Sequence, residues 1–288
     1  KTVTRGLGAG MDPEIGKRAA EEAQNDIREM IKDANMVFLA CGLGGGTGSG
    51  ASPVVAQLAK DMGILTVAVV TKPFAFEGRP RRAIAEAAYA ELSRHVDTII
   101  SVQNDKVLKV SDKKTSMVDA FKLVDDVLRQ GVQGISEIIT IPGTINVDFA
   151  DVCRIMKDAG TALMGIGTAR GEHRVMEAAK QAIASPLLDV SIDGARGILL
   201  TITGGMDLGI HEVDEAATIV TGSADENVRV IFGTTIDESM GDEVRVTVIA
   251  TGFDSEDALV SVPKKHMPEP VDRGNRGGGN LGGSFSRR

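Results

Sequence analysis

Gly42-Leu43-Gly44-Gly45-Gly46-Thr47-Gly48-Ser49-Gly50 is the stretch that decides the fold, with six glycines in nine residues. It follows a continuous apolar run at 36–41 and precedes an amphipathic pattern at 53–62 and a second apolar run at 64–70. Strand, loop, helix and strand in this order form a βαβ unit with a parallel sheet. Because glycine has no Cβ, the N–H groups of the loop can approach an anion closely, and the dipole of the next helix favours negative charge there. The stretch therefore predicts a phosphate-binding loop.

The residues around the loop narrow the class of phosphate compound. No Lys-Ser or Lys-Thr pair follows the glycines, so the loop is not a P-loop. Gly46, Gly48 and Ala51 satisfy a loose dinucleotide fingerprint, but Thr71 and Lys72 stand where that fingerprint requires an acidic residue. A nicotinamide-dependent oxidoreductase therefore stays open only as an alternative that Lys72 disfavours.

Outward from the loop, helical and strand patterns alternate along the chain. Apolar residues at three- and four-residue spacing predict helices at 13–33, 82–94, 117–140, 151–157 and 172–184. Short apolar runs predict further strands at 98–102, 162–167, 197–203, 227–232 and 243–251. The helix at 117–140 would be about 36 Å long, enough to cross a domain. We expect an α/β fold of four parts: a parallel-sheet nucleotide-binding domain (1–116), a long central helix (117–141), a mixed α/β C-terminal domain (142–254) and a flexible tail (255–288).

Composition and charge exclude several classes of protein. At 42% hydrophobic and 25% charged residues, the 288-residue chain is expected to be globular, and no apolar run reaches the ~18 residues that span a bilayer. The net charge is −8, of which the Gly-rich segment from Lys264 to Arg288 carries +4 and the remainder −12. This balance argues against nucleic-acid binding. Cys41 and Cys153 lie in apolar stretches and are expected to be reduced packing residues of a cytosolic protein.

Several segments resemble one family. GGGTGSG at 44–50 is similar to the signature loop of the tubulin/FtsZ superfamily. The flanking segments resemble bacterial FtsZ from Gly6 to Phe253, including RGLGAGMDPEIGKRAAEE, AVVTKPFAFEGRPRR, NDKVLKV, NVDFADV and EVRVTVIATG. The resemblance implies a GTPase that polymerises head to tail into the filaments of the division ring, in the cytoplasm at mid-cell.

The resemblance also assigns roles to residues. It implies that Gly46, Thr47 and Gly48 contact phosphates, that Gly44 and Gly45 shape the approach, and that Ala9 and Gly10 form a second phosphate loop. Glu77 and Arg81 are expected to contact the ribose and phosphates. Asn104 and Asp126 are expected to contact guanine. A carboxylate can accept from both guanine N1–H and the exocyclic amine, a pairing that adenine does not offer. Asp119 and Asp126 are seven residues apart, which places them on one helix face. We expect no protein-held metal, only Mg²⁺ that arrives with GTP.

The segment Asn146-Val147-Asp148-Phe149-Ala150-Asp151 is the second chemical candidate. As local structure it is a helix start, with Asp148 as the N-cap and Asp151 in the first turn. The resemblance implies that this loop enters the nucleotide site of the next subunit, where Asn146, Asp148 and Asp151 form the catalytic set. The two aspartates would position and polarise the attacking water.

Three departures from the family pattern qualify this interpretation. An upstream strand, a first Gly-rich phosphate loop and its helix are absent, so we expect an incomplete N-terminus and unpaired sheet neighbours. Asp125 stands where the family usually has Asn, and the tail lacks the Pro-containing hydrophobic peptide that binds membrane-tethering partners. One alternative therefore remains beside the oxidoreductase: a structural module that copolymerises but does not bind GTP alone.

Overall fold

The computed structural model describes residues 2–110, 114–141, 143, 145, 147–185, 192, 194–224 and 228–253. Asn146 and the tail at 255–288 lie outside the described residues, so the predictions made for them are not addressed by the structure. The strands of the described part are β1 (Met36–Gly42), β2 (Leu65–Lys72), β3 (Thr98–Gln103), β4 (Gly160–Arg170), β5 (Gly197–Gly204), β6 (Arg229–Ile236) and β7 (Glu243–Thr251). The helices are α1 (Pro13–Glu22), α2 (Gln24–Ile31), α3 (Gly46–Asp61), α4 (Arg79–Leu92), α5 (Asn104–Val110), α6 (Met117–Thr140), α7 (Phe149–Met156), α8 (Arg174–Ile183) and α9 (Ile210–Thr221).

All of these strands join one sheet in the order β1-β2-β3-β4-β7-β5-β6. The pairs from β1 to β4 are parallel, β7 lies antiparallel between β4 and β5, and β6 is parallel to β5. The predicted α/β class, with a parallel first half and a mixed second half, is confirmed. The sheet is nevertheless continuous, because residues 98–100 of β3 pair with residues 160–162 of β4.

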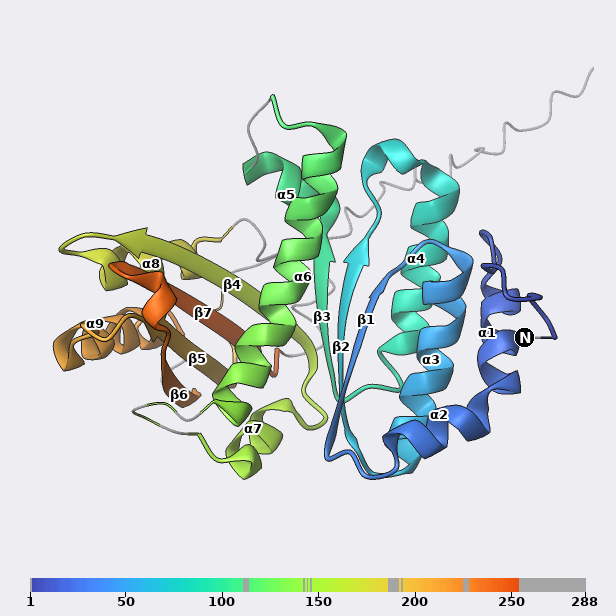
Figure 1. Cartoon of the computed structure of the whole chain (residues 1–288), viewed down its shortest axis with the longest axis horizontal. Helices are drawn as coiled ribbons and strands as arrows, with labels where there is room; N and C mark the ends of the chain where they lie inside the picture. The colour runs from blue at the N-terminus through green and yellow to red at the C-terminus, as the bar shows by residue number, and fades with distance from the viewer. Residues whose placement is uncertain are drawn as a thin grey trace, which may run out of the picture.

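Helix α6 has the predicted bounds and runs along one face of the sheet from end to end (Figure 1). Ser116 caps it by accepting a hydrogen bond from the N–H of Asp119 at 3.1 Å. Alternation along β4 explains why both faces of the sheet are covered: Ala162 and Met164 pack in the core under α6 and α7, and Leu163 packs in the core under α8 and α9. Helices α3 and α4 cover the other face of the first half, over Ala68 and Val70. A long central helix thus touches both halves of the sheet.

Some predicted elements differ from the structure. The helix predicted at 13–33 is two helices, since the chain leaves helical geometry at Ala23 (φ −100°, ψ 8°) and α2 begins at Gln24. The helix predicted from residue 53 begins earlier, at Gly46, so half of the glycine-rich stretch is helical. Helices α5 and α9 were not predicted. The thiols of Cys41 and Cys153 are free and half-buried.

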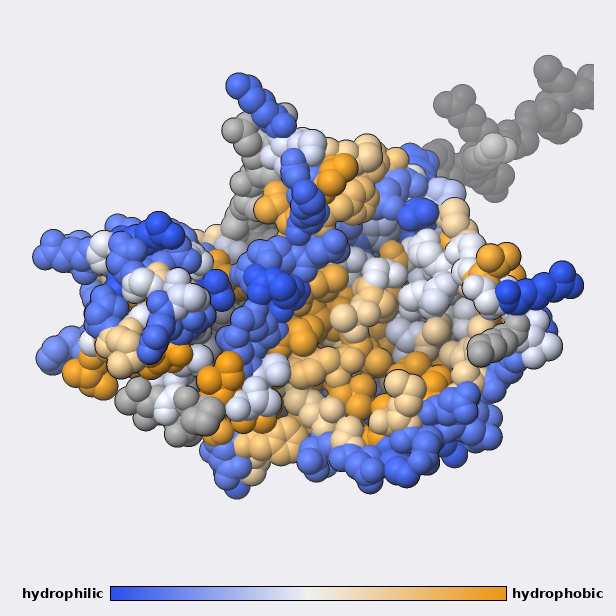
Figure 2. Space-filling view, viewed as in Figure 1, coloured by the Kyte–Doolittle hydropathy of each residue, from blue (hydrophilic) through white to orange (hydrophobic). Residues whose placement is uncertain are grey.

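Strand β1 lies at the edge of the sheet and differs from the buried strand that its apolar sequence predicts. It is bonded to β2 along its length and, within the described residues, to no strand on its other side. Met36, Val37, Phe38 and Leu39 are consequently only half-buried. Figure 2 shows the result as a hydrophobic surface between α6 and α3.

No helix in the described ranges is long and apolar enough to cross a membrane.

Candidate functional site

The two predicted phosphate loops meet at the start of α3, at the carboxyl end of β1. The N–H of Gly46 donates to the carbonyl of Gly10 at 2.7 Å. The N–H of Ala9 donates to the hydroxyl oxygen of Thr47 at 3.3 Å, which leaves the hydroxyl hydrogen of Thr47 available for another acceptor. Residues 36 and 38 positions apart in the sequence are thereby brought together.

The glycines of the stretch serve close approach between backbones. A Cβ on Gly46 would lie 2.7 to 2.8 Å from the carbonyl oxygens of Ala9, Gly10 and Asp12. A Cβ on Gly48 would lie 2.3 Å from the carbonyl oxygen of Gly42. A side chain at Gly46 would push the second loop away from α3, and one at Gly48 would push α3 away from the end of β1. The glycines therefore hold the second loop against the first turn of α3.

Gly45 is different, because a Cβ added there would meet no atom within 4 Å. Gly45 is the N-cap of α3 and supplies no side-chain acceptor to the first-turn N–H groups. A helix N-terminus without a side-chain cap, next to open space, is suited to an anion that accepts from those N–H groups. The cradle fits a phosphate group.

Glu77 and Arg81 lie beside this cradle. Arg81 is the third residue of α4, and its Nη1 donates a hydrogen bond to Oε2 of Glu77 at 2.8 Å. Glu77 also accepts from the N–H of Phe74 at 3.0 Å through its other oxygen. The carbonyl oxygen of Arg81 would be 2.9 Å from a Cβ on Gly44, a glycine with φ of +103°. The pair is thus fixed against the signature loop.

Asn104 provides the clearest sign of a missing partner. Its side chain is 5% exposed, and its Oδ1 is the one buried side-chain oxygen or nitrogen in the described residues without a hydrogen-bond partner. Asn104 directly follows β3 and starts α5, at the same edge of the sheet as the signature loop. Because leaving a buried polar atom unpaired costs about 1 to 3 kcal/mol, a ligand donor is the natural partner for this oxygen.

Aromatic side chains also gather at this edge. Phe74 is fully buried, stacks on Phe76 at 5.0 Å and meets Phe121 edge-on at 5.2 Å. Phe76 and Phe121 are exposed and offer flat surfaces on which a purine base can stack. The sequence analysis missed them, since Phe121 fits the apolar repeat of α6 and its exposure is visible only in the structure.

The carboxylates of α6 point in different directions. Oδ1 of Asp126 accepts from Nε and Nη2 of Arg129 at 2.9 and 2.7 Å, and its Oδ2 accepts from Gln130. Asp119, on the same face, pairs with Lys122. Asp125 is exposed and follows Phe121 by four residues, about one helical turn. Helix geometry therefore puts Asp125 about 40° around the helix from Phe121 and Asp126 about 140°.

The catalytic candidates lie at the other end of α6. Asp148 is the N-cap of α7 and accepts from the N–H of Ala150 at 3.0 Å. Asp151 follows in the first turn and pairs with Arg154 at 3.3 Å. Helix α7 sits at the bottom of Figure 1, whereas the carboxyl ends of β1 to β3 and the start of α6 are at the top. Within one chain, therefore, Asp148 and Asp151 cannot reach the cradle.

The electrostatics of the site come from backbone and paired groups rather than from a metal cluster. In the ranges that the structure describes, no three His, Cys, Asp or Glu side chains are arranged to hold a metal ion. Burial raises the pKa of the Cys41 thiol, which donates to the carbonyl of Gly48 at 3.8 Å. This thiol is therefore neutral and adds no negative charge beside the phosphate cradle.

Comparisons with known families bear on this arrangement. Residues 1–112 match the tubulin/FtsZ family, GTPase domain, and residues 160–254 match the FtsZ family, C-terminal domain. An empty FtsZ dimer from M. jannaschii is 46% identical, with a TM-score of 0.85, over 88% of this chain and 73% of that one. The chain belongs to the FtsZ family.

Other structures agree with this assignment. The W319Y mutant of the M. jannaschii FtsZ matches equally well, over 76% of its length. CetZ1 from Haloferax volcanii, a GDP-bound monomer, shares the fold at 20% identity with a TM-score of 0.72 over 88% of this chain and 76% of that one. This FtsZ-family chain is a GTP-dependent polymerising GTPase, and neither the oxidoreductase nor the non-binding module is favoured.

Proposed function

We propose that the chain assembles head to tail into a homopolymer and hydrolyses GTP at the contact between subunits. The observation that carries the proposal is the separation of the two sets of site residues, at opposite ends of α6 (Figure 1). Neither end holds the full set of residues for hydrolysis alone, because the phosphate cradle lies at the start of α3 and the two candidate catalytic aspartates lie at the start of α7. Stacking one subunit on the next joins them, and a head-to-tail contact that does not close gives a filament.

At the upper end, the chain's own residues would bind and orient the nucleotide. First-turn N–H groups of α3 would donate to phosphate oxygens next to Gly45, with Thr47 adding its hydroxyl. Arg81 would balance charge on the phosphates while Glu77 holds its position. Mg²⁺, when bound, would neutralise charge on the phosphates, with most of its ligands from phosphate oxygens and water.

At the lower end, Asp148 and Asp151 of the neighbouring subunit would position and polarise the attacking water, together with Asn146. Asp148 is bound only to the N–H of Ala150 through one oxygen, so its second oxygen can accept from water. Asp151 pairs with Arg154 at 3.3 Å. Two carboxylates near one water suit general base chemistry.

Guanine selection rests on Asn104 and on one carboxylate of α6. The sequence predicts Asp126, whereas the open oxygens of Asp125 and its position beside Phe121 support Asp125. The two neighbours are matched controls for each other. We expect Asp125→Ala to weaken GTP binding by ten-fold or more, about the 1.5 to 3 kcal/mol of a charge-assisted pair, and Asp126→Ala to change it little. Calorimetry with GTP and ATP measures both, and the reverse order of effects would restore Asp126.

Exchange of the catalytic loop between subunits is tested by mixing two variants. Asp148→Asn removes the charge but keeps a side chain that caps α7 equally well, so folding should be preserved. It should bind GTP like the parent and hydrolyse it about 10² to 10⁴ times more slowly. Gly45→Val fills the open space of the cradle and should abolish GTP binding.

Mixed together, the two variants should regain activity that neither has, because Gly45→Val subunits supply Asp148 to the nucleotide held by their neighbours. Sedimentation checks that they copolymerise. A mixture that copolymerises yet hydrolyses GTP no faster than the sum of its components contradicts the shared site. Failure of the parent chain to bind GTP at all would instead favour the copolymerising module.

The cellular role follows from this activity. We propose that the filament works in the division ring, in the cytoplasm at mid-cell, as a scaffold built from one protein. Fluorescence microscopy of the tagged chain checks the location, and diffuse fluorescence in dividing cells would contradict it.

A further inference from the structure

The turn that joins β2 to α4, residues 73–78, carries two groups of the proposed nucleotide site, Phe76 and Glu77. Phe74 is fully buried at its base, whereas Ala75 and Phe76 are exposed. Glu77 closes the turn on itself, because its N–H donates to the carbonyl of Phe74 at 3.1 Å and its Oε1 accepts from the N–H of Phe74 at 3.0 Å. These hydrogen bonds shape the turn without joining it to another segment.

A carboxylate from another segment holds the outer part of this turn. The N–H of Ala75 donates to Oδ1 of Asp105 at 2.9 Å, across 30 positions of sequence. The second oxygen of Asp105, Oδ2, lies 3.7 Å from Nη2 of Arg82 in the first turn of α4. One side chain therefore joins the start of α5, the turn and the start of α4.

The position of Asp105 in the site gives this contact its importance. Asp105 directly follows Asn104, whose buried Oδ1 has no hydrogen-bond partner among the described residues and is the proposed contact for guanine. The turn that Asp105 holds carries Glu77, which binds Arg81 at 2.8 Å on the phosphate side. The hydrogen bond from Ala75 to Asp105 thus links the base side of the site to its phosphate side.

A purely local role for Asp105 does not account for the contact. An acidic residue in the first turn of a helix stabilises that helix through the dipole, and it can do so while pointing into solvent. Asp105 is instead 43% exposed, and its two oxygens contact a backbone N–H and a guanidinium. Asn104 lies about 100° around α5 from Asp105. The two side chains therefore leave α5 in different directions, Asn104 into the interior and Asp105 toward the turn.

From this geometry we propose that Asp105 is a positioning residue of the nucleotide site, which acts through the turn at 73–78 and does not touch the nucleotide. The proposal rests on the proposed function, since it concerns how that same site is assembled. With Asp105 in place, Phe76 and Glu77 keep a fixed spacing from Asn104 before GTP arrives. Without it, the nucleotide would have to order the turn as it binds, which lowers affinity. The chemical step would be spared, because the neighbouring subunit positions the attacking water.

The mobility of the turn, measured without nucleotide, tests the tether directly. The chain contains no tryptophan, so Phe76→Trp places a single indole on the exposed part of the turn. The fluorescence anisotropy of this indole should fall when Asp105→Ala is added. Asp105→Asn keeps an oxygen that can accept from the N–H of Ala75 and should retain the higher anisotropy. Thermal melts followed by circular dichroism check that each variant folds.

Steady-state hydrolysis of GTP, measured with Phe76 intact, separates positioning from chemistry. Asp105→Ala should raise the KM for GTP about five-fold and leave kcat within about two-fold of the parent, since the lost hydrogen bond is to a charged group that solvent partly screens. Asp105→Asn should restore a KM close to that of the parent. Arg82→Ala removes the ion pair but keeps the hydrogen bond from Ala75, so its KM should also stay close to that of the parent.

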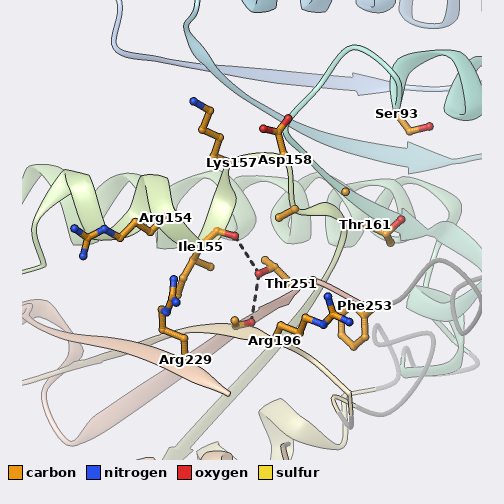
Figure 3. Close-up of a pocket in the computed structure, with 14 residues that line it drawn as sticks. Ser93, Arg154, Ile155, Lys157, Asp158, Thr161, Arg196, Arg229, Thr251 and Phe253 are labelled. Atoms are coloured by element: carbon orange, nitrogen blue, oxygen red, sulfur yellow. Dashed lines mark hydrogen bonds between the residues drawn. The ribbon is translucent and has the colours of Figure 1, made fainter. Parts of the chain in front are cut away.

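Two variants elsewhere control for the loss of an acidic residue. Glu177→Ala removes an exposed carboxylate from the first turn of α8, as Asp105→Ala does from α5. Asp158→Gly removes an exposed carboxylate 4.0 Å from Lys60, on the turn between α7 and β4 (Figure 3). Glycine suits this position because the backbone has φ of +50° there. Both variants should keep the indole anisotropy and the KM of the parent.

Unchanged anisotropy in Asp105→Ala would overturn the proposal, and so would a looser turn with an unchanged KM. An Asp105→Asn variant as impaired as Asp105→Ala would also overturn it, by assigning the effect to the charge and not to the hydrogen bond. An equal rise of KM in either control would show that any exposed carboxylate has the same effect. The anisotropy is read without GTP. A parent chain that binds no GTP would therefore refute the proposed function, and the anisotropy would still decide whether Asp105 holds the turn.

Discussion

Replacement of Gly46 by alanine isolates what the glycines of the signature loop contribute. Gly46→Ala adds one carbon that would lie 2.7 to 2.8 Å from three carbonyl oxygens, those of Ala9, Gly10 and Asp12. Ordinary van der Waals contact begins at 3.4 Å, so the second loop must move by 0.6 to 0.7 Å. All three neighbours are backbone atoms and cannot turn aside. The added carbon therefore separates the two loops.

The expected cost follows from three contributions. Overpacking costs about 1 to 3 kcal/mol, and weakening of the 2.7 Å hydrogen bond from Gly46 to Gly10 costs about 0.5 to 1.5 kcal/mol. The better helix propensity of alanine returns about 0.5 to 1 kcal/mol. We expect the free energy of unfolding to fall by about 1 to 3.5 kcal/mol. GTP affinity should fall as well, because Ala9 and Gly10 no longer face the first turn of α3.

Gly45→Ala is the matched control, one residue away. Gly45 has φ −100° and ψ 178°, which any residue adopts, and its added Cβ would meet nothing within 4 Å. Its free energy of unfolding should stay within about 0.5 kcal/mol of the parent. Its GTP affinity should nevertheless fall about ten-fold, or 1.4 kcal/mol, since the methyl group occupies space that phosphates need.

Urea denaturation followed by circular dichroism, without nucleotide, gives the two stabilities, and calorimetry gives the GTP affinities. Gly46→Ala should change both quantities, and Gly45→Ala only the affinity. Parent-like stability in Gly46→Ala would show that the loops are not in contact as described. Parent-like GTP affinity in Gly45→Ala would show that the phosphates lie elsewhere.

Two other predictions concern single buried groups. Asn104→Ala should weaken GTP binding about ten-fold in calorimetry yet change the unfolding free energy by less than about 1 kcal/mol, because the Oδ1 that it removes has no hydrogen-bond partner among the described residues; equal GTP affinity would leave that oxygen unexplained. Arg174→Ala should lower the free energy of unfolding by about 3 kcal/mol in urea, since the buried guanidinium binds Asp207 and Glu212 at 2.9 Å each; a loss below 1 kcal/mol would mean that the carboxylates are fully solvated. Arg174 also holds the pKa of Glu212 below its ordinary value of 4.5, so this pair stabilises the fold above pH 4.5, and that stabilisation is lost as pH falls through the lowered pKa. The free energy of unfolding should therefore fall less steeply on acidification in Arg174→Ala than in the parent. An unchanged acid dependence would contradict the pairing.

The parts of the fold that could be predicted are those where one local pattern decides. The α6 stripe recurs every three or four residues for 24 residues, and its bounds were predicted correctly. Strand β7 was likewise found from its apolar residues. The order of strands could not be predicted, because the insertion of β7 between β4 and β5 depends on pairing between distant segments.

The site residues likewise divide into those that the sequence could predict and those that only the structure reveals. The resemblance predicts a phosphate role for both Gly10 and Gly46, and the structure brings the two residues into contact. The choice between Asp125 and Asp126 depends on 100° of helix rotation and on whether Arg129 takes up a carboxylate, and residue type alone says nothing of either. The burial of Asn104 arises from packing between segments distant in the sequence, so only the structure could reveal it.

The open edge of β1 has a practical consequence for any assay of assembly. In the part of the chain that the structure describes, β1 is an apolar strand bonded on one side only, and such an edge can pair with the same strand of another molecule without any nucleotide. Light scattering would rise both when GTP drives polymerisation and when β1 edges pair. Only the part of the scattering signal that GDP reverses therefore reports ordered polymer. The two processes also differ in amide exchange: edge pairing would slow deuterium uptake in β1, whereas contact through the two ends of α6 would leave β1 exchanging as in the monomer.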